Sequence, residues 1–307
     1  MATVAILVST YNGEKFLSEQ LDSLLAQSGV EAEIFVRDDG SSDGTAEILK
    51  GYEKRCSNFH AEFGRNLGVG NSFMNLLYSV PDTFDYYAFS DQDDIWDKEK
   101  ISEAIKLIVE RGALLYASNQ KCTDKDGNTQ ELRYDVARHI HTAPAEIISR
   151  NMVSGCTMVF PNRFFKLLTA EDKRPSEALL KNRIHDVWLA MVASLYDGIV
   201  YDERAFIRYR QHENNVVGAY EGGRKRKSKE RKKKLRNSEL RNGRSRLAQE
   251  VCGRFPDKAD KYPIIGICSR AKSFGGKMKI LKNGKQLRSY TGEGRLGFFV
   301  KVMLGLF

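Results

Sequence analysis

The first 220 residues alternate between short apolar runs and segments with helical periodicity. The apolar runs, each of which predicts a strand, cover residues 4–8, 34–36, 59–63 and 86–89. Between them, residues 14–27, residues 45–52 and the segment that follows residue 70 carry apolar side chains at helical spacing. This alternation predicts an α/β fold in which helices pack on a parallel sheet.

Polar motifs follow three of the predicted strands. STYNGE occupies residues 9–14, DDGSSDG occupies residues 38–44 and SDQDD occupies residues 90–94. In open α/β sheets, ligands bind beyond the carboxyl ends of the strands. We therefore expect the three motifs to line a single site.

The acidic motif narrows the choice of ligand. No G-x-G-x-x-G follows a strand and no G-x-x-x-x-G-K-[ST] occurs, which argues against dinucleotide and P-loop sites. Asp91 and Asp93 instead supply hard oxygen ligands that suit Mg²⁺ or Mn²⁺. Such a cation can neutralise a departing diphosphate. The alternative is that the acids cap a helix predicted to begin within residues 97–100, a role that suits Asp97.

The composition is that of a globular protein in a reducing compartment. Hydrophobic residues make up 41% of the 307 positions, enough for one sizeable core and a smaller appendage. The five cysteines include no C-x-x-C pair, which argues against a disulfide framework or a zinc site. The N-terminus lacks a basic segment before its apolar run, and no apolar stretch reaches the roughly 18 residues of a transmembrane helix. We expect a cytoplasmic protein.

Positive charge is concentrated in one segment. Residues 224–246 contain 13 Lys and Arg against two Glu, a net of +11, whereas the whole chain carries +9. This change of composition predicts a boundary between a domain at 1–220 and a basic, amphipathic C-terminal region at 221–307. Because no aromatic residues are interleaved with the charges, nucleic acid is not the expected partner. An anionic membrane surface is favoured, and a solvated charged helix is the alternative.

The last residues, 295–307, form an apolar run that is too short to span a membrane. Among its apolar members are Leu296, Phe298, Phe299, Val300, Met303, Leu304, Leu306 and Phe307. Such a run can lie in a membrane interface, pack on the N-terminal domain or form a homodimer contact. The sequence leaves these three possibilities open.

Four segments occur in order along the first 218 residues, namely VAILVSTYNGE, IFVRDDGSSDGT, NLGVG and FSDQDDIW. Together they resemble the family 2 glycosyltransferases of the GT-A fold. The resemblance implies a Rossmann-like mixed sheet flanked by helices, followed here by a basic, mainly helical extension. It also implies an inverting, metal-dependent enzyme of the hexosyltransferase type that uses Mn²⁺ or Mg²⁺.

The resemblance implies roles for individual positions. Asp39 is expected to accept a hydrogen bond from a pyrimidine N–H, and the loop at Gly68 to admit ribose and phosphate. The full set of implied nucleotide-sugar-binding residues is Thr10, Tyr11, Asn12, Glu14, Asp39, Asn66, Gly68, Asp91, Gln92 and Arg210. The implied metal ligands are Asp93, Asp91 and His212, with Asp94 behind them.

Sugar transfer with inversion needs a base that takes the proton of the acceptor hydroxyl. The resemblance places this base at the start of the helix in NRIHDVWLAMVASLYDG, which makes Asp186 the expected catalytic residue. Many relatives have Glu-Asp where this chain has His185 and Asp186. The alternative for Asp186 is an N-cap. Trp188 is expected either to present its ring to a sugar or to pack in the core. Upstream, residues 151–160 are expected to form a strand whose small residues admit the acceptor.

The segment IRYRQHENNVVG, residues 207–218, resembles a bacterial subgroup when it is taken together with SDQDDIW. Many members of this subgroup are rhamnosyltransferases. The resemblance favours dTDP-L-rhamnose as donor and a lipid-linked saccharide as acceptor, in cell-wall, capsule or O-antigen synthesis on the inner face of the cell membrane. UDP-hexoses are the alternative donors. A non-catalytic nucleotide-sugar binding protein and a nucleotidyltransferase are the alternative classes.

Overall fold

The structure, a computed structural model, describes residues 1–124, 128–135, 142–181, 185–212 and 241–307. The chain forms two compact units. The sheet unit comprises Met1–Ile140, Val153–Glu171 and Gly198–Ala219, and the helical unit comprises His141–Met152, Asp172–Asp197 and Tyr220–Phe307. Residues 172–197 therefore group with the C-terminal helices. The boundary predicted at residue 220 lies outside the described residues and stays a prediction.

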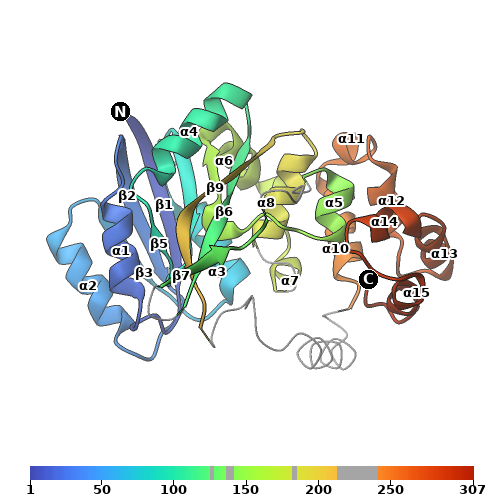
Figure 1. The fold of residues 1–307 in the computed structure, drawn as a ribbon, viewed down its shortest axis with the longest axis horizontal. Coiled ribbons are helices and arrows are strands. Elements are labelled where there is room, and N and C mark those ends of the chain that lie inside the picture. Colours follow the sequence, from blue (N-terminus) through green and yellow to red (C-terminus); the bar gives the residue numbers. More distant parts are fainter. Residues whose placement is uncertain (125–127, 136–141, 182–184, 213–240) are drawn as a thin grey trace. The chain divides into compact units, whose positions relative to one another are not determined.

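A mixed sheet forms the centre of the sheet unit (Figure 1). Its strands are β1 (Ala2–Thr10), β2 (Val30–Asp38), β3 (Phe59–Phe63), β4 (Tyr86–Ser90), β5 (Ile95–Trp96), β6 (Leu115–Thr123), β7 (Thr129–Leu132), β8 (Val159–Pro161) and β9 (Ile199–Arg210). They follow the order β3-β2-β1-β4-β8-β6-β9-β5, and β7 pairs with β6. The neighbours among β1, β2, β3 and β4 are parallel, whereas β8 runs antiparallel to β4 and β6. The expected α/β fold with a mixed sheet is confirmed.

Helices flank this sheet because each has one apolar face. The leucines of α1 (Leu17–Leu25) that recur every three to four residues are buried in one cluster with alternate residues of β1. The other helices of this unit are α2 (Thr45–Arg55), α3 (Val69–Ser79), α4 (Lys100–Arg111) and α6 (Asn162–Thr169). α4 ends at Gly112, whose φ of 62° is the left-handed conformation that favours glycine.

Residues 151–160 do not form the predicted strand. The Ser154 carbonyl accepts the N–H of Thr157 at 3.1 Å, and the Gly155 carbonyl accepts the N–H of Met158 at 2.9 Å. These bonds close the 3₁₀ turn η1 (Gly155–Thr157). Because the turn uses these backbone donors internally, only the short strand β8 joins the sheet.

The helical unit contains η2 (Glu171–Lys173, which spans the boundary between the units), α5 (Pro144–Ser149), α7 (Glu177–Leu180), α8 (His185–Ser194), α10 (Gly243–Arg254), α11 (Pro256–Ala259), α12 (Pro263–Ser269), α13 (Phe274–Lys282), α14 (Gly284–Ser289) and α15 (Arg295–Met303). α8 is buried on nearly all sides. Trp188 is fully buried, and its ring centroid lies 6.1 Å from that of Phe255. Its ring packs in the core, which is the second of the two roles expected for it and excludes a sugar platform. Within the described parts of the chain, no helix is long and apolar enough to cross a membrane.

Candidate active site

The carboxyl ends of β1, β2 and β4 meet at one edge of the sheet. The register pairs the last residues of β1 and β2, Thr10 and Asp38, and aligns the end of β4 two positions before the end of β1. Tyr11, Asp39 and Asp91 are the first residues beyond these three ends. The structure thus brings the three polar motifs together, as the sequence predicts.

The side chain of Gln92 ties the acidic motif to the end of β1. Its Oε1 atom accepts hydrogen bonds from the Thr10 hydroxyl at 2.7 Å and from the Tyr11 N–H at 2.8 Å. Its Nε2 atom donates to the Tyr11 carbonyl at 3.3 Å. Thr10 is buried, whereas Tyr11 is 48% exposed. Gln92, which was expected to bind the nucleotide sugar, therefore contacts the protein and fixes the backbone that carries the Tyr11 ring.

Asn12 and Glu14 connect the loop after β1 to the loop after β2. Asn12 has a φ of 49°, a left-handed conformation that asparagine adopts more readily than most residues. Its Oδ1 atom accepts the N–H of Ser42 at 2.9 Å. The Glu14 carboxylate accepts the N–H of Gly44 at 3.0 Å. In the structure, both side chains hold residues 41–44 in place beside the sheet edge.

Asp39 holds the loop that precedes α3. Its buried carboxylate accepts the N–H groups of Leu67 at 2.8 Å and Gly68 at 2.9 Å, and it forms an ion pair with Arg37. Gly68 has a φ of 81°, which other residues adopt at a cost, and the neighbouring Asn66 is exposed. A carboxylate offers about four acceptor sites. Within the described part of the chain three N–H donors reach Asp39, which leaves one acceptor site for a further donor.

The end of β9 also contacts the acidic motif. His212 Nε2 lies 2.7 Å from Asp93 Oδ2. The main-chain N–H of Arg210 donates to Asp94 Oδ1 at 3.2 Å, and its Nε atom donates to the Asp93 carbonyl at 3.2 Å. The Nη2 atom of the same arginine donates to Glu19 at 2.5 Å. Arg210 is thus buried among protein acceptors, and its contacts hold the motif in position.

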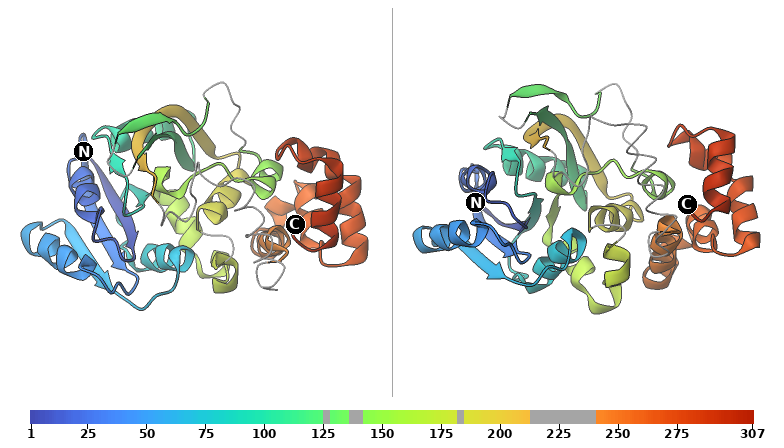
Figure 2. Two further views of the ribbon diagram at one scale, coloured as in Figure 1. Left: turned by 60° about the horizontal axis from the view of Figure 1, so that its bottom comes forward. Right: turned by 90° about the horizontal axis from the view of Figure 1, so that it is seen from below.

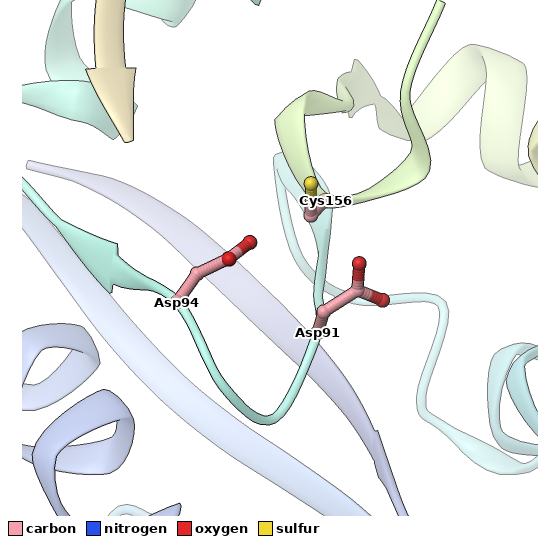
Figure 3. A group of neighbouring side chains, drawn as sticks. All are labelled: Asp91, Asp94 and Cys156. Atoms are coloured by element: carbon pink, nitrogen blue, oxygen red, sulfur yellow. The ribbon is translucent and has the colours of Figure 1, made fainter. Parts of the chain in front are cut away.

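Asp91, Asp94 and Cys156 form a compact group in which Cys156 comes from η1 (Figure 3). One ligand atom from each lies within 4.8 Å of the others. Burial raises the pKa of Asp94 well above its usual range, and the carboxylates of Asp93 and Asp91 raise it further. Burial also raises the pKa of the Cys156 thiol well above its usual range. A protonated thiol does not suit Mg²⁺ or Mn²⁺, whereas carboxylate oxygens do. A hard cation at this motif would therefore use ionised carboxylates and not the thiol, and this group contains Asp91 but neither of the other two expected ligands, Asp93 and His212.

Lys100 is a buried cationic residue that the sequence analysis missed. Its Nζ atom lies 3.3 Å from the centre of the Trp96 ring and has no hydrogen-bond partner among the described residues. Burial lowers the pKa of Lys100 to about 7, even though nearby acidic groups oppose this shift. Lys100 lies four and eight residues before Ala104 and Ile108, which are buried in α4. This i, i+4, i+8 spacing is the signal that indicates its burial.

Asp97 does not cap α4, contrary to expectation. The N-cap of α4 is Glu99. The Asp97 carboxylate instead lies 3.6 Å from Lys121 and 4.0 Å from Arg208. The Asp97 carboxylate thus pairs with Lys121 of β6 and Arg208 of β9 and not with the N-terminus of α4. Because these ion pairs are partly exposed, they contribute little to stability.

A comparison with known families identifies the chain. Residues 5–167 match the family described as Glycosyl transferase family 2. The chain belongs to this family. Over 220 residues, the glycosyltransferase is 32% identical to the dTDP-rhamnosyl transferase RfbG of Shigella flexneri. The aligned region covers 69% of this chain and 74% of that protein. It is 27% identical over 165 residues to the putative teichuronic acid biosynthesis glycosyltransferase TuaG of Bacillus subtilis. This aligned region covers 52% of this chain and 62% of that protein.

Solved structures agree with this family membership at the level of the fold. The structure of S. aureus TarS 1–349 in complex with UDP matches the glycosyltransferase with a TM-score of 0.61 and 20% identity, over 98% of this chain and 80% of that chain. At this identity the likeness concerns the fold alone. The glycosyltransferase has the expected GT-A fold, with a helical C-terminal region.

Asp186 lies in the helical unit of the glycosyltransferase, in the first turn of α8. It is half-buried, and its Oδ1 atom accepts the N–H of Val187 at 2.6 Å. As the second residue of α8, it is not at the N-cap position. His185 is 2% exposed, and burial lowers its pKa to about 3. The His-Asp pair therefore combines a neutral buried ring with a more accessible carboxylate.

A polar network beside Cys156 was also missed by the sequence analysis. Arg133 Nη1 donates to Gln120 Oε1 at 2.6 Å and to Ser154 Oγ at 3.1 Å. Gln120 Nε2 donates to Cys156 Sγ at 3.0 Å. Every residue of β6 except Lys121 is buried, so alternation of polar and apolar residues could not indicate that Gln120 is a core residue.

Proposed function

We propose that this family 2 glycosyltransferase is an inverting enzyme that moves L-rhamnose from dTDP-L-rhamnose to a lipid-linked saccharide. The observation that carries the proposal is the meeting of Tyr11, Asp39 and Asp91 beyond three strands aligned at one sheet edge. This edge combines an exposed aromatic ring, a carboxylate with one acceptor site left and an acidic loop. The aromatic ring can stack on a nucleobase, and the carboxylate can accept the N–H group of that base. The acidic loop can bind the cation of a metal-bound diphosphate.

In the proposal, the nucleotide binds along this edge. The Tyr11 ring stacks on the base, and the remaining acceptor site of Asp39 takes the pyrimidine N–H. The loop at Asn66 and Gly68 receives the ribose and phosphate. A Cβ atom added at Gly68 would meet no atom within 4 Å, so this loop is open to a ligand. Thr10, Asn12, Glu14 and Gln92 support the binding edge through the loop contacts described above.

A divalent cation, Mn²⁺ or Mg²⁺, belongs to the proposed site. Asp91 and Asp93 would hold it through carboxylate oxygens, with His212, whose Nε2 atom is 2.7 Å from Asp93 Oδ2, as the third ligand. When bound, the cation supplies positive charge that offsets the charge of the leaving diphosphate. Asp94 and Arg210 hold the acidic loop through the Arg210 N–H, which donates to Asp94, and the Arg210 Nε atom, which donates to the Asp93 carbonyl.

Inversion corresponds to a single displacement. The acceptor hydroxyl oxygen forms a bond to the anomeric carbon while the bond from that carbon to the diphosphate oxygen breaks. The diphosphate leaves with the bonding electron pair, and Asp186 accepts the hydroxyl proton. Because burial keeps His185 neutral, no positive charge from this ring lies beside the Asp186 carboxylate.

The similarity of this chain to RfbG and TuaG supports the proposed donor and the proposed class of product. RfbG, at 32% identity over 74% of its length, is described as a dTDP-rhamnosyl transferase, which favours rhamnose. TuaG is described as a teichuronic acid biosynthesis glycosyltransferase, which favours a polysaccharide product. The lipid-linked nature of the acceptor follows from the subgroup resemblance in the sequence.

A panel of nucleotide sugars tests the proposal. In the presence of Mn²⁺, dTDP-L-rhamnose should raise the melting temperature more than UDP-glucose, UDP-galactose or UDP-N-acetylglucosamine, because a ligand stabilises the state that binds it. Mass spectrometry of the product should then show one added deoxyhexose. A stronger response to a UDP-sugar would assign a different donor. Binding without transfer to any saccharide acceptor would favour a non-catalytic binding protein.

A further inference from the structure

Two helices of the helical unit present apolar side chains to solvent. The side chains of this α13–α15 face are between 43% and 77% exposed, and they are Phe274, Met278, Leu296, Phe299, Val300 and Leu304. Residues 274 and 278 are four apart on α13, and residues 296, 299 and 300 recur at helical spacing on α15. Each helix therefore concentrates its exposed apolar residues on one side.

The opposite sides of the same helices face the core of the helical unit. Ile280 of α13 and Phe298 and Val302 of α15 are buried, and the Phe298 and Phe307 rings meet edge to face. The apolar run at 295–307 is thus divided between a buried side and an exposed side. The exposed side therefore contributes little to packing within this unit.

The helices α13 and α15 pack against each other. They lie side by side at the red end of the ribbon in Figure 2. Lys277, between Phe274 and Met278 on α13, donates from Nζ to the Met303 carbonyl of α15 at 2.8 Å. This bond brings the apolar side of α13 next to the end of α15 that carries Leu304.

The surroundings of the α13–α15 face are strongly basic. Residues 270–301 contain nine Lys and Arg against the single acid Glu293, which is itself paired with Lys301. The exposed basic residues are Arg270, Lys272, Lys279, Lys282, Lys285 and Arg295. The expectation that the positive charge is confined to residues 224–246 is therefore incomplete, because the described helices beyond this segment carry a second basic cluster.

We infer that the α13–α15 face docks on an anionic lipid bilayer. Exposed apolar side chains on a segment that also carries exposed lysines match an interface in which acyl chains lie below negative headgroups. A second copy of the chain is a poorer occupant, because a two-fold contact would bring two copies of this basic segment together. Nucleic acid is also a poorer occupant, because only Phe274 and Phe299 among the six side chains carry a ring, and the other four offer no surface on which a base can stack. The bilayer is where a lipid-linked acceptor would reside.

Co-sedimentation of the full chain with lipid vesicles tests this inference. The wild type should bind vesicles of phosphatidylcholine mixed with phosphatidylglycerol at least about tenfold more tightly than vesicles of phosphatidylcholine alone, and less tightly as salt is raised. Phe274→Ser with Phe299→Ser, and separately Lys279→Glu with Lys282→Glu, should each weaken binding by at least about tenfold. Val109→Ser, which changes a residue of α4 that is 67% exposed, should bind as the wild type does.

Three outcomes would overturn the inference. In the first, the wild type does not bind anionic vesicles, and in the second, the Phe274→Ser, Phe299→Ser variant binds them as tightly as the wild type does. In the third, light scattering shows a wild-type dimer and a monomeric variant. Sugar transfer to a water-soluble acceptor, measured in parallel, should be unchanged in the variants. Its absence in the wild type would count against the proposed function and leave the vesicle result intact.

Discussion

The side-chain amide of Gln92 holds the backbone of Tyr11 at both its N–H and its carbonyl, with distances of 2.8 Å and 3.3 Å. The position of the Tyr11 ring therefore depends on a residue of the acidic motif. We predict that Gln92→Met, which keeps the length of the side chain and removes these bonds, raises the KM for the donor about tenfold and changes kcat little. Steady-state kinetics with varied donor concentration measure both constants.

The matched control for this variant is Gln286→Met in α14, which changes an exposed glutamine of the helical unit. It should leave both constants unchanged. A fall in kcat at constant KM for Gln92→Met would contradict a role in placing the Tyr11 ring.

Asp186→Asn is predicted to abolish sugar transfer and preserve donor binding. The amide cannot accept the hydroxyl proton, and loss of a general base reduces rates by about 10²–10⁴-fold. Calorimetry with the donor should give an unchanged Kd, while product formation falls. Asp257→Asn, an exposed change in α11 of the same unit, is the control and should retain activity. Near-normal turnover of Asp186→Asn would assign the base elsewhere.

Asp93→Ala is predicted to weaken nucleotide binding only when Mn²⁺ or Mg²⁺ is present. The carboxylate acts through the cation, so chelation by EDTA should bring the wild type down to the level of the variant. His212→Asn should lower metal affinity by about 10–100-fold, because it removes the group in contact with Asp93. Asp97→Asn serves as the control, since its carboxylate contacts Lys121 and Arg208. An equal loss for Asp93→Ala with and without EDTA would point to a structural role.

Stability is predicted to fall in acid through His185. The usual pKa of about 6.5 applies in the unfolded chain, whereas burial lowers the pKa to about 3 in the folded chain. Between these values the unfolded chain binds one more proton, so the free energy of unfolding decreases as the pH falls from about 6.5 to 3. The slope is about 1.4 kcal/mol per pH unit. Urea unfolding across this range measures it.

His185→Leu should remove that part of the pH dependence, because an apolar side chain binds no proton. His60→Leu changes a histidine that is about half exposed on β3 and controls for the general effect of losing a histidine. Parallel pH profiles for the wild type and His185→Leu would show that the acid sensitivity arises from other groups.

The sheet edge was predictable because its strands are short continuous apolar runs, and their ends carry polar motifs. The pairing of β5 with β9 was not predictable, because β5 has only two residues and its partner lies more than a hundred residues later. The roles of Gln92, Asn12 and Glu14 depend on loop conformation, which residue type alone does not specify. Lys100 was missed because lysine is rarely buried, although its spacing relative to Ala104 indicates the core face.

The contacts between the end of β9 and the acidic motif affect the order in which parts of the protein fold during synthesis. Arg210 and Asp94 are 116 residues apart, and His212 and Asp93 are 119 residues apart. On the ribosome, the edge formed by β1, β2 and β4 can assemble while the acidic loop still lacks both partners. Such distant contacts form late in folding. A nascent or prematurely terminated chain would therefore display the edge formed by β1, β2 and β4 without a fixed acidic loop, and the proposed sugar transfer would begin only after β9 has been synthesised.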